Sequence, residues 1–281
     1  MSREIRDYGF EDADDVFWVA YYWKDEFEGD WLPARLHVLL LDKTTGAWRQ
    51  RTLEKESLPR SALTPEGLGI GSVLRLHHGP RYLYLDTHYN PSAGGLIVLT
   101  RDLEPEAVLW GWFLFALPGG GVVYHRSQVH FAPTHPLELG LYDPVMGSDR
   151  VFYPSKPYDA PRLAFIGKMK GAYDSFGDDW CRRNNHHCDP EQFTSSWRDA
   201  WSVDLETGTA AFLVEFGDSF KRSSSHPDTS VPPSRIVVVC RGVATPSRMT
   251  CTEIEWAPLA KAHPGASEEE IVRLAARGSR R

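Results

Sequence analysis

Residues 79–99 read GPRYLYLDTHYNPSAGGLIVL, and residues 121–141 read GVVYHRSQVHFAPTHPLELGL. At a constant offset of 42 (130 less 88) the two segments share five identical residues. The identical pairs are Gly79 with Gly121, Tyr82 with Tyr124, His88 with His130, Pro91 with Pro133, and Leu99 with Leu141. A fixed period of this length is typical of repeat architectures, in which each repeat is one supersecondary unit. The sequence therefore predicts a fold built from repeated units.

The segments between turns are short and rich in aromatic and β-branched residues. VFWVAYY (16–22), WGWFLFAL (110–117) and RIVVVC (235–240) are examples. This composition predicts strands, and runs that are apolar at nearly every position indicate sheets covered on both faces. The clearest helical pattern lies at the C-terminus, where Ser267 precedes EEEIVRLAARG with an acidic first turn and a final glycine.

The connections between these segments alternate in length. Residues 24–33 and 54–69 are long connections, whereas 42–46 and 77–80 are short ones. Successive connections of an antiparallel meander fall at opposite ends of the sheet, so the long, polar loops should collect on one face. We expect that face to carry the function.

A meander with this period, and with the Asp-containing turns LDKTTG (41–46) and VDLETG (203–208), resembles the β-propellers of the WD-repeat and TolB-like groups. The resemblance extends over about residues 3–256 and concerns the fold, because the Gly-His and Trp-Asp signature of WD repeats is missing. It implies an all-β propeller of four blades, near residues 3–53, 70–110, 111–154 and 197–256. A fifth blade follows if residues 155–196 contain strands, and a β-sandwich is the alternative fold.

Length and composition are compatible with one β domain. The chain has 281 residues, of which 42% are hydrophobic, enough to bury a substantial core. We expect a single domain over residues 1–256, with 155–196 as a partly helical or irregular insertion, followed by a tail over 257–281 with a short helix.

Charge and hydropathy exclude some classes of partner. The net charge is -7 and no basic stripe is present, which argues against nucleic acid. The sequence contains no run of about 18 apolar residues, so it predicts no membrane span. The N-terminus also lacks the pattern of a signal peptide. These features predict a cytoplasmic protein, or an exported one if a signal peptide has been removed.

The segment DDWCRRNNHHCDPEQF (178–193) holds the densest group of metal-ligand residue types. Its candidate zinc ligands are Cys181, His186, His187, Cys188 and Asp189. The spacing suits a disulfide or a pair of thiols equally well. The second close pair, Cys240 and Cys251, leaves the same alternatives of disulfide, thiols or metal ligands open.

The loop YWKDEFEGDW (22–31) places four acidic residues between aromatic ones. Asp25, Glu28 and Trp31 are candidate ligand-binding residues, since paired carboxylates beside aromatic rings are what a glycosidase uses. The alternative is a solvated acidic surface or a loose calcium site. No cofactor is required by the sequence, and zinc or calcium are the ions that these two segments would take.

The stretch QVHFAPTHP (128–136) contains His130 and His135, and the first repeat contains His88 and Asn90. These four residues are further candidates for ligand binding at the long-loop face. His88 and His130 should occupy equivalent corners of neighbouring blades, each three residues before a proline. Each imidazole either fixes its own turn through a backbone hydrogen bond, or faces the axis and binds metal or carries protons.

The sequence thus predicts a binding protein whose long-loop face holds a protein or small-molecule ligand. The alternative is a hydrolase acting on a glycan or an ester at the same face, with a metal ion assisting.

Overall fold

The computed structural model describes residues 3–28, 32–64, 69–89, 93–126, 138–153, 196–216, 234–243, 245 and 248–278. The chain divides into two compact units, which are described separately below. Unit 1 is Met1–Ser127 with Leu139–Val151, and unit 2 is Gln128–Glu138 with Phe152–Arg281. Residues 155–195 of the predicted insertion lie outside the described residues.

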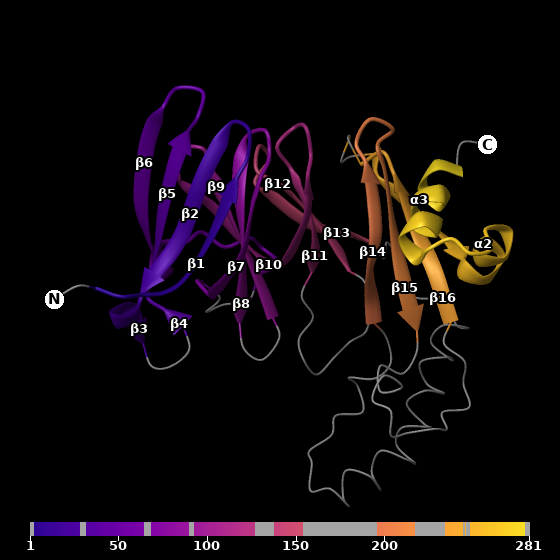
Figure 1. Cartoon of the computed structure of the whole chain (residues 1–281), viewed down its shortest axis with the longest axis horizontal. Coiled ribbons are helices and arrows are strands. Elements are labelled where there is room, and N and C mark those ends of the chain that lie inside the picture. The colour runs from indigo at the N-terminus through magenta and orange to yellow at the C-terminus, as the bar shows by residue number, and fades with distance from the viewer. Residues whose placement is uncertain are drawn as a thin grey trace, which may run out of the picture. The chain divides into compact units, whose positions relative to one another are not determined.

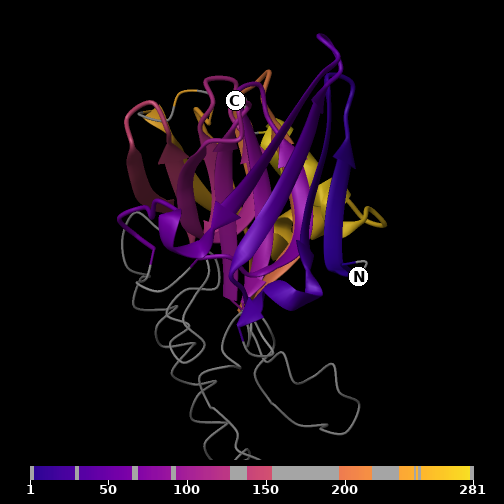
Figure 2. The ribbon, with the colours of Figure 1, turned by 90° about the vertical axis from the view of Figure 1, so that its left-hand side faces the viewer.

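The first sheet of unit 1 is an antiparallel meander whose described strands follow the order β1-β2-β5-β6 (Figures 1 and 2). Its strands are β1 (Ile5–Asp12), β2 (Val16–Trp23), β5 (Arg35–Asp42) and β6 (Ala47–Glu54). Between β2 and β5 lie the 3-10 turn η1 (Lys24–Glu26) and the short pair β3 (Phe27–Glu28) and β4 (Leu32–Pro33). Along β2 the residues alternate between buried and half-buried, which is the period-2 pattern of a strand with one face on the core.

The second sheet of unit 1 follows η2 (Lys55–Ser57) and, in the described part of the chain, has the order β13-β12-β11-β10-β9-β8-β7. Its strands are β7 (Ser72–His78), β8 (Tyr82–Tyr89), β9 (Ala93–Thr100), β10 (Pro105–Ala116), β11 (Val122–Arg126), β12 (Leu139–Asp143) and β13 (Ser148–Tyr153). All neighbouring strands with a described register are antiparallel.

Strand β10 folds back on itself at Trp110 and Gly111. The first half, up to Trp110, pairs with β9, and the second half, from Gly111, pairs with β11. Both ends of β10 lie near Gly79. A Cβ built on Gly79 would be 2.7 Å from that of Ala116, and Arg101, in the turn between β9 and β10, donates to the Gly79 carbonyl at 2.8 Å. Two meanders, residues 72–110 and 111–153, therefore share one folded strand.

Gly111 is required at this corner because there is no room for a side chain. A Cβ at this position would lie 2.3 Å from the His125 carbonyl oxygen and 2.6 Å from Tyr124 Cδ2. The fold-back lets the two meanders bury a shared apolar cluster. Its buried members are Tyr84, Leu96, Val98, Ala107, Leu109, Val122, Tyr124 and Tyr142.

The short connections of unit 1 meet at one end of its sheets. Arg101 donates to the Asp15 carboxylate at 3.0 Å, and the Asp15 carbonyl accepts the Lys43 N–H at 3.0 Å. At the other end the Ala34 carbonyl accepts the Lys55 N–H at 3.1 Å, which joins the long β2–β5 connection to the long β6–β7 connection. The predicted segregation of short and long connections is confirmed for the described part of unit 1.

In unit 2 the described strands form an antiparallel sheet in the order β14-β15-β16-β17, followed by two helices (Figure 1). The elements are β14 (Ser196–Asp204), β15 (Thr209–Phe216), β16 (Ser234–Arg241), β17 (Thr250–Glu255), α2 (Trp256–Ala262) and α3 (Glu268–Gly278). Helix α3 begins as predicted, since the Ser267 Oγ accepts the Glu270 N–H at 3.2 Å. Helix α3 packs on one face of the sheet through Val272, Ala275 and Ala276.

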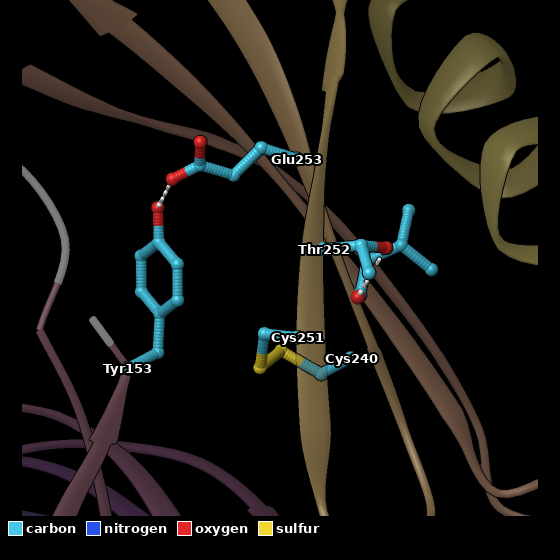
Figure 3. Close-up of a disulfide and its surroundings, with 6 residues drawn as sticks. Tyr153, Cys240, Cys251, Thr252 and Glu253 are labelled. Carbon is cyan, nitrogen blue, oxygen red and sulfur yellow. Dashed lines mark hydrogen bonds between the residues drawn. A yellow bond between two sulfur atoms is a disulfide. The ribbon is translucent and has the colours of Figure 1, made fainter. Parts of the chain in front are cut away.

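Cys240 on β16 and Cys251 on β17 lie directly opposite each other and form a disulfide (Figure 3). Of the alternatives that the sequence left open for this pair, the structure has the disulfide. It fastens β17, the edge strand of its sheet. Tyr153, the last residue of β13, belongs to unit 2, and its hydroxyl donates a hydrogen bond to Glu253 of β17 at 2.8 Å (Figure 3).

The predicted all-β fold class with a short C-terminal helix is confirmed. The described strands fall in the groups 5–54, 72–110, 111–153 and 196–255, close to the four predicted segments. Helix α2 was not predicted. The number of blades, and the WD-repeat or TolB-like type, stay predictions. Among the described residues, no helix combines the length and the apolar character that crossing a membrane requires.

Replacing Gly111 with Ala should lower the free energy of unfolding by about 2–4 kcal/mol, because the added methyl meets backbone that cannot move aside. Gly119→Ala is the matched control, since a Cβ there has no atom within 4 Å. Urea denaturation measures both variants. Equal stability of the two would show that the corner has room for a side chain.

Replacing both Cys240 and Cys251 with Ala should lower the free energy of unfolding by about 2–3 kcal/mol, since the disulfide closes a loop with a sequence separation of 11. Denaturation without reductant measures the loss. Peptide mapping of the unreduced parent protein should recover the two cysteines in one cross-linked fragment. Their recovery as separate alkylated peptides would contradict the disulfide.

Candidate functional site

The acidic loop places one carboxylate in a buried position. Glu26 is 9% exposed, and its two oxygens accept hydrogen bonds from Arg3 Nη2 at 3.0 Å and His37 Nε2 at 2.8 Å. Asp25 beside it is exposed and accepts from the same guanidinium at 2.9 Å. The His37 ring stacks on Tyr21 with centroids 5.2 Å apart. The side chains of Glu28 and Trp31 lie outside the description.

Electrostatics keep both of these carboxylates ionised. Burial raises the pKa of Glu26, but the hydrogen bonds from His37 and Arg3 outweigh burial and the net pKa is lowered. The hydrogen bond from Arg3 likewise lowers the pKa of Asp25. A glycosidase needs one carboxyl group that stays protonated near neutral pH. As placed, Glu26 and Asp25 hold Arg3 and the N-terminal strand instead.

A second polar group lies on β7 and β8 beside the fold-back of β10, with His88 at the long-connection end of unit 1 and His77 next to the short β7–β8 turn. We call it the corner site. Its residues come from β7, β8 and β10 and are His77, Asp86, His88, Trp112 and Phe113.

Asp86 organises one half of the corner site. Asp86 is 5% exposed, and its oxygens accept hydrogen bonds from the Phe113 N–H at 2.8 Å and from His77 Nε2 at 3.0 Å. The His77 ring lies flat on Phe113, with centroids 4.2 Å apart and planes inclined by 13°. The carboxylate therefore fixes the imidazole, while His77 Nδ1 has no protein partner among the described residues.

His88 and Trp112 form the other half. Their rings stack with centroids 6.2 Å apart, and both are half-buried. A Cβ on Gly94 would lie 2.4 Å from Trp112 Cε2, so the indole occupies the space that a side chain at Gly94 would fill. The His88 ring makes no hydrogen bond within the described structure. Both roles expected for His88, fixing its turn and binding metal or carrying protons, stay predictions, since residues 90–92 of that turn lie outside the described residues.

Asp149 belongs to a third polar group, which is structural. It accepts hydrogen bonds from the hydroxyls of Tyr124, at 2.7 Å, and Ser61. Burial raises the pKa of Asp149, although these hydrogen bonds oppose the rise. The Tyr124 ring crosses Gly140 on the way, and a Cβ there would be 2.2 Å from Tyr124 Cζ.

Several candidate residues from the sequence cannot be placed in either unit. Outside the described residues lie Asn90, His130, His135, Cys181, His186, His187, Cys188 and Asp189. The zinc site and the equivalence of His88 with His130 stay predictions. Within the described ranges no group of three or more His, Cys, Asp or Glu side chains is arranged to hold a metal ion.

Sequence reasoning identified His88 of this site but did not single out Asp86, His77 or Trp112. The signal for Trp112 was Gly111, a glycine inside an apolar aromatic run, which marks a bend or a close approach of backbone. His77 carries no signal of its own, because its partner Asp86 is nine residues away on the next strand.

Comparison with known proteins gives no assignment. No family model matches the chain, and no curated protein matches it. Among solved structures it is similar to the GH43_1 enzyme from Xanthomonas citri. The complex of that enzyme with xylose has a TM-score of 0.31 at 9% identity, and the complex with xylotriose a TM-score of 0.29 at 10% identity. Each alignment covers 89% of this chain and 73% of the other. Similarity at this level does not establish a shared fold or activity, so the function is argued from the residues of this chain.

Replacing Glu26 with Gln should lower the free energy of unfolding by about 2 kcal/mol at pH 7. The reason is that the charge-assisted hydrogen bonds that the Glu26 carboxylate accepts from Arg3 and His37 are lost. The folded-state pKa of Glu26 lies below its ordinary value of 4.5. The stability it contributes is therefore present above pH 4.5 and lost as the pH falls through the lowered pKa. The difference in the free energy of unfolding between the parent protein and Glu26→Gln should therefore become smaller as the pH is lowered.

Urea denaturation at pH 7, 5 and 3 measures this gap. Glu56→Gln is the matched control, since Glu56 is exposed and has no partner among the described side chains. A gap that stays constant from pH 7 to pH 3 would contradict an ionised role for Glu26.

Proposed function

We propose that the protein binds a polar small molecule at the corner site. The observation that carries this proposal is an imidazole held by a buried carboxylate, His77 on Asp86, with its second nitrogen unused by the described protein. A second imidazole, His88, also has unused nitrogens and lies on Trp112. Binding sites commonly combine aromatic walls with a few fixed polar groups of this kind.

The chemistry of the site suits a hydroxylated ring. Since Asp86 accepts a hydrogen bond from Nε2 of His77, a neutral His77 presents Nδ1 as an acceptor for a ligand hydroxyl. The half-buried indole of Trp112 offers an apolar surface to the CH face of the same ligand. A sugar supplies both groups.

The second candidate function is a hydrolase that uses His77 as general base. In this reaction His77 Nδ1 takes a proton from water as the water oxygen attacks an ester carbonyl, and His77 then gives that proton to the departing alkoxide, which restores the neutral imidazole. An imidazole oriented by a buried carboxylate is the feature in its favour. However, both oxygens of Asp86 and both oxygens of Glu26 already bind protein donors. Neither carboxylate is available as the acid that a glycosidase would need.

Binding is tested by ligand-observed NMR with D-glucose and cellobiose as probes. His88→Ala should weaken binding by about tenfold, and Trp112→Ala by at least as much, because an aromatic contact and a donor are lost. Trp48→Ala is the control, since Trp48 is 57% exposed and lies on the other sheet of unit 1. Circular dichroism confirms that each variant is folded.

The hydrolase alternative is tested with 4-nitrophenyl acetate and 4-nitrophenyl β-D-glucoside. If the protein turns over either substrate, and this turnover is lost in His77→Gln but kept in His88→Ala, the function is hydrolysis and not binding alone. No turnover, together with binding that depends on His88, supports the binding function. Binding unchanged in both His88→Ala and Trp112→Ala would move the ligand away from the corner site.

A further inference from the structure

Arg75 lies on the face of β7 that carries the corner site. In the β7–β8 register Ser72 is opposite His88, Arg75 opposite Asp86, and His77 opposite Tyr84. Side chains directly opposite each other in an antiparallel pair share one face of the sheet. Successive rows, two residues apart, are about 7 Å apart. Arg75 therefore stands one row from His77 and one row from His88.

The guanidinium of Arg75 is exposed and, within the described structure, makes no ion pair or hydrogen bond. Other arginines of unit 1 are paired: Arg3 with Asp25, Arg35 with Glu54, and Arg101 with Asp15. The chain carries a net charge of -7, so carboxylates are plentiful. Arg75 is directly opposite a carboxylate, yet Asp86 is bound by Phe113 and His77 instead.

The negative charge of Asp86 does not cancel the attraction of Arg75 for an anion. Asp86 is 5% exposed, and its oxygens are covered by the Phe113 N–H and His77. A ligand arriving from solvent meets Arg75 first. A guanidinium pairs with an oxyanion through two parallel hydrogen bonds, which makes arginine well suited to carboxylate and phosphate groups.

We infer that the ligand of the corner site is a sugar that carries an oxyanion, held by Arg75 at the anionic group and by His77 Nδ1 at a hydroxyl. This inference rests on the proposed binding function, and it adds that the site selects a negatively charged ligand. The two protein groups are one row apart on β7, about 7 Å, which a single sugar ring with its exocyclic group can span. A carboxylate and a phosphate share this chemistry.

The test is isothermal titration calorimetry at constant ionic strength with three probes: D-glucuronate, D-glucose 6-phosphate and D-glucose. At least one of the two anionic sugars should bind about tenfold or more tightly than glucose, and the pair tells a carboxylate ligand from a phosphate ligand. Arg75→Gln should remove this advantage, so that neither anionic sugar binds more tightly than glucose does. Arg75→Lys should keep part of it, since it retains the charge but loses the paired hydrogen bonds. Arg81→Gln is the matched control, because Arg81 is an exposed arginine in the short turn before β8.

The outcomes separate this inference from the function on which it rests. Equal affinities for glucose and both anionic sugars, all weakened by His88→Ala, would keep the binding site and overturn the charge specificity. Tighter binding of an anionic sugar that survives Arg75→Gln would overturn the role of Arg75. Binding of none of the three probes would overturn both the inference and the proposed function.

Discussion

The reversal of β10 at Gly111 is the constraint on which the rest of unit 1 depends. One strand serves two meanders, so their faces are forced together without a connecting loop. The close approach is possible because position 111 has no side chain to meet Tyr124 and the His125 carbonyl. Tyr124 in turn crosses Gly140 to reach Asp149, which ties β11 to β13. Two glycines thus provide the space that one buried tyrosine fills.

The same reversal produces the corner site. Because the strand turns back immediately before Trp112, that indole lies on Gly94 of β9 and beside His88 of β8. The next residue, Phe113, gives its N–H to Asp86 and its ring to His77. Burying a carboxylate is costly unless it is hydrogen-bonded, and Asp86 meets that condition through β10 backbone and a β7 side chain. The site is therefore held by the interactions that hold the corner.

The strands could be predicted from the sequence because their pattern is local. Alternation, turn residues and connection lengths placed the boundary between two meanders at residues 110 and 111, where the register changes partner. Helix α2 was missed because Pro258 lies near its start, where the missing N–H of proline costs nothing. The site was harder, since pairs such as His77 with Asp86 and Arg3 with Glu26 join different strands. Long-range register creates them, and a single sequence does not specify it.

Glu26 and Asp86, which are the buried carboxylates among the described residues of unit 1, show why residue type alone misleads about catalysis. The loop around Glu26 has the composition of a glycosidase site, yet Arg3 and His37 engage both of its oxygens and hold it ionised. Asp86 is bound equally completely. A saturated carboxylate cannot exchange a proton with a substrate unless the fold gives up a hydrogen bond, which costs about 1–3 kcal/mol for each partner left buried. Arg75, His77 Nδ1 and His88 carry no such cost, because no described protein group engages them. At the corner site, the hydrogen-bonding capacity that the described residues leave for a ligand is therefore in a guanidinium and two imidazoles, which favours recognition of an oxyanion and a hydroxyl over acid catalysis by paired carboxylates.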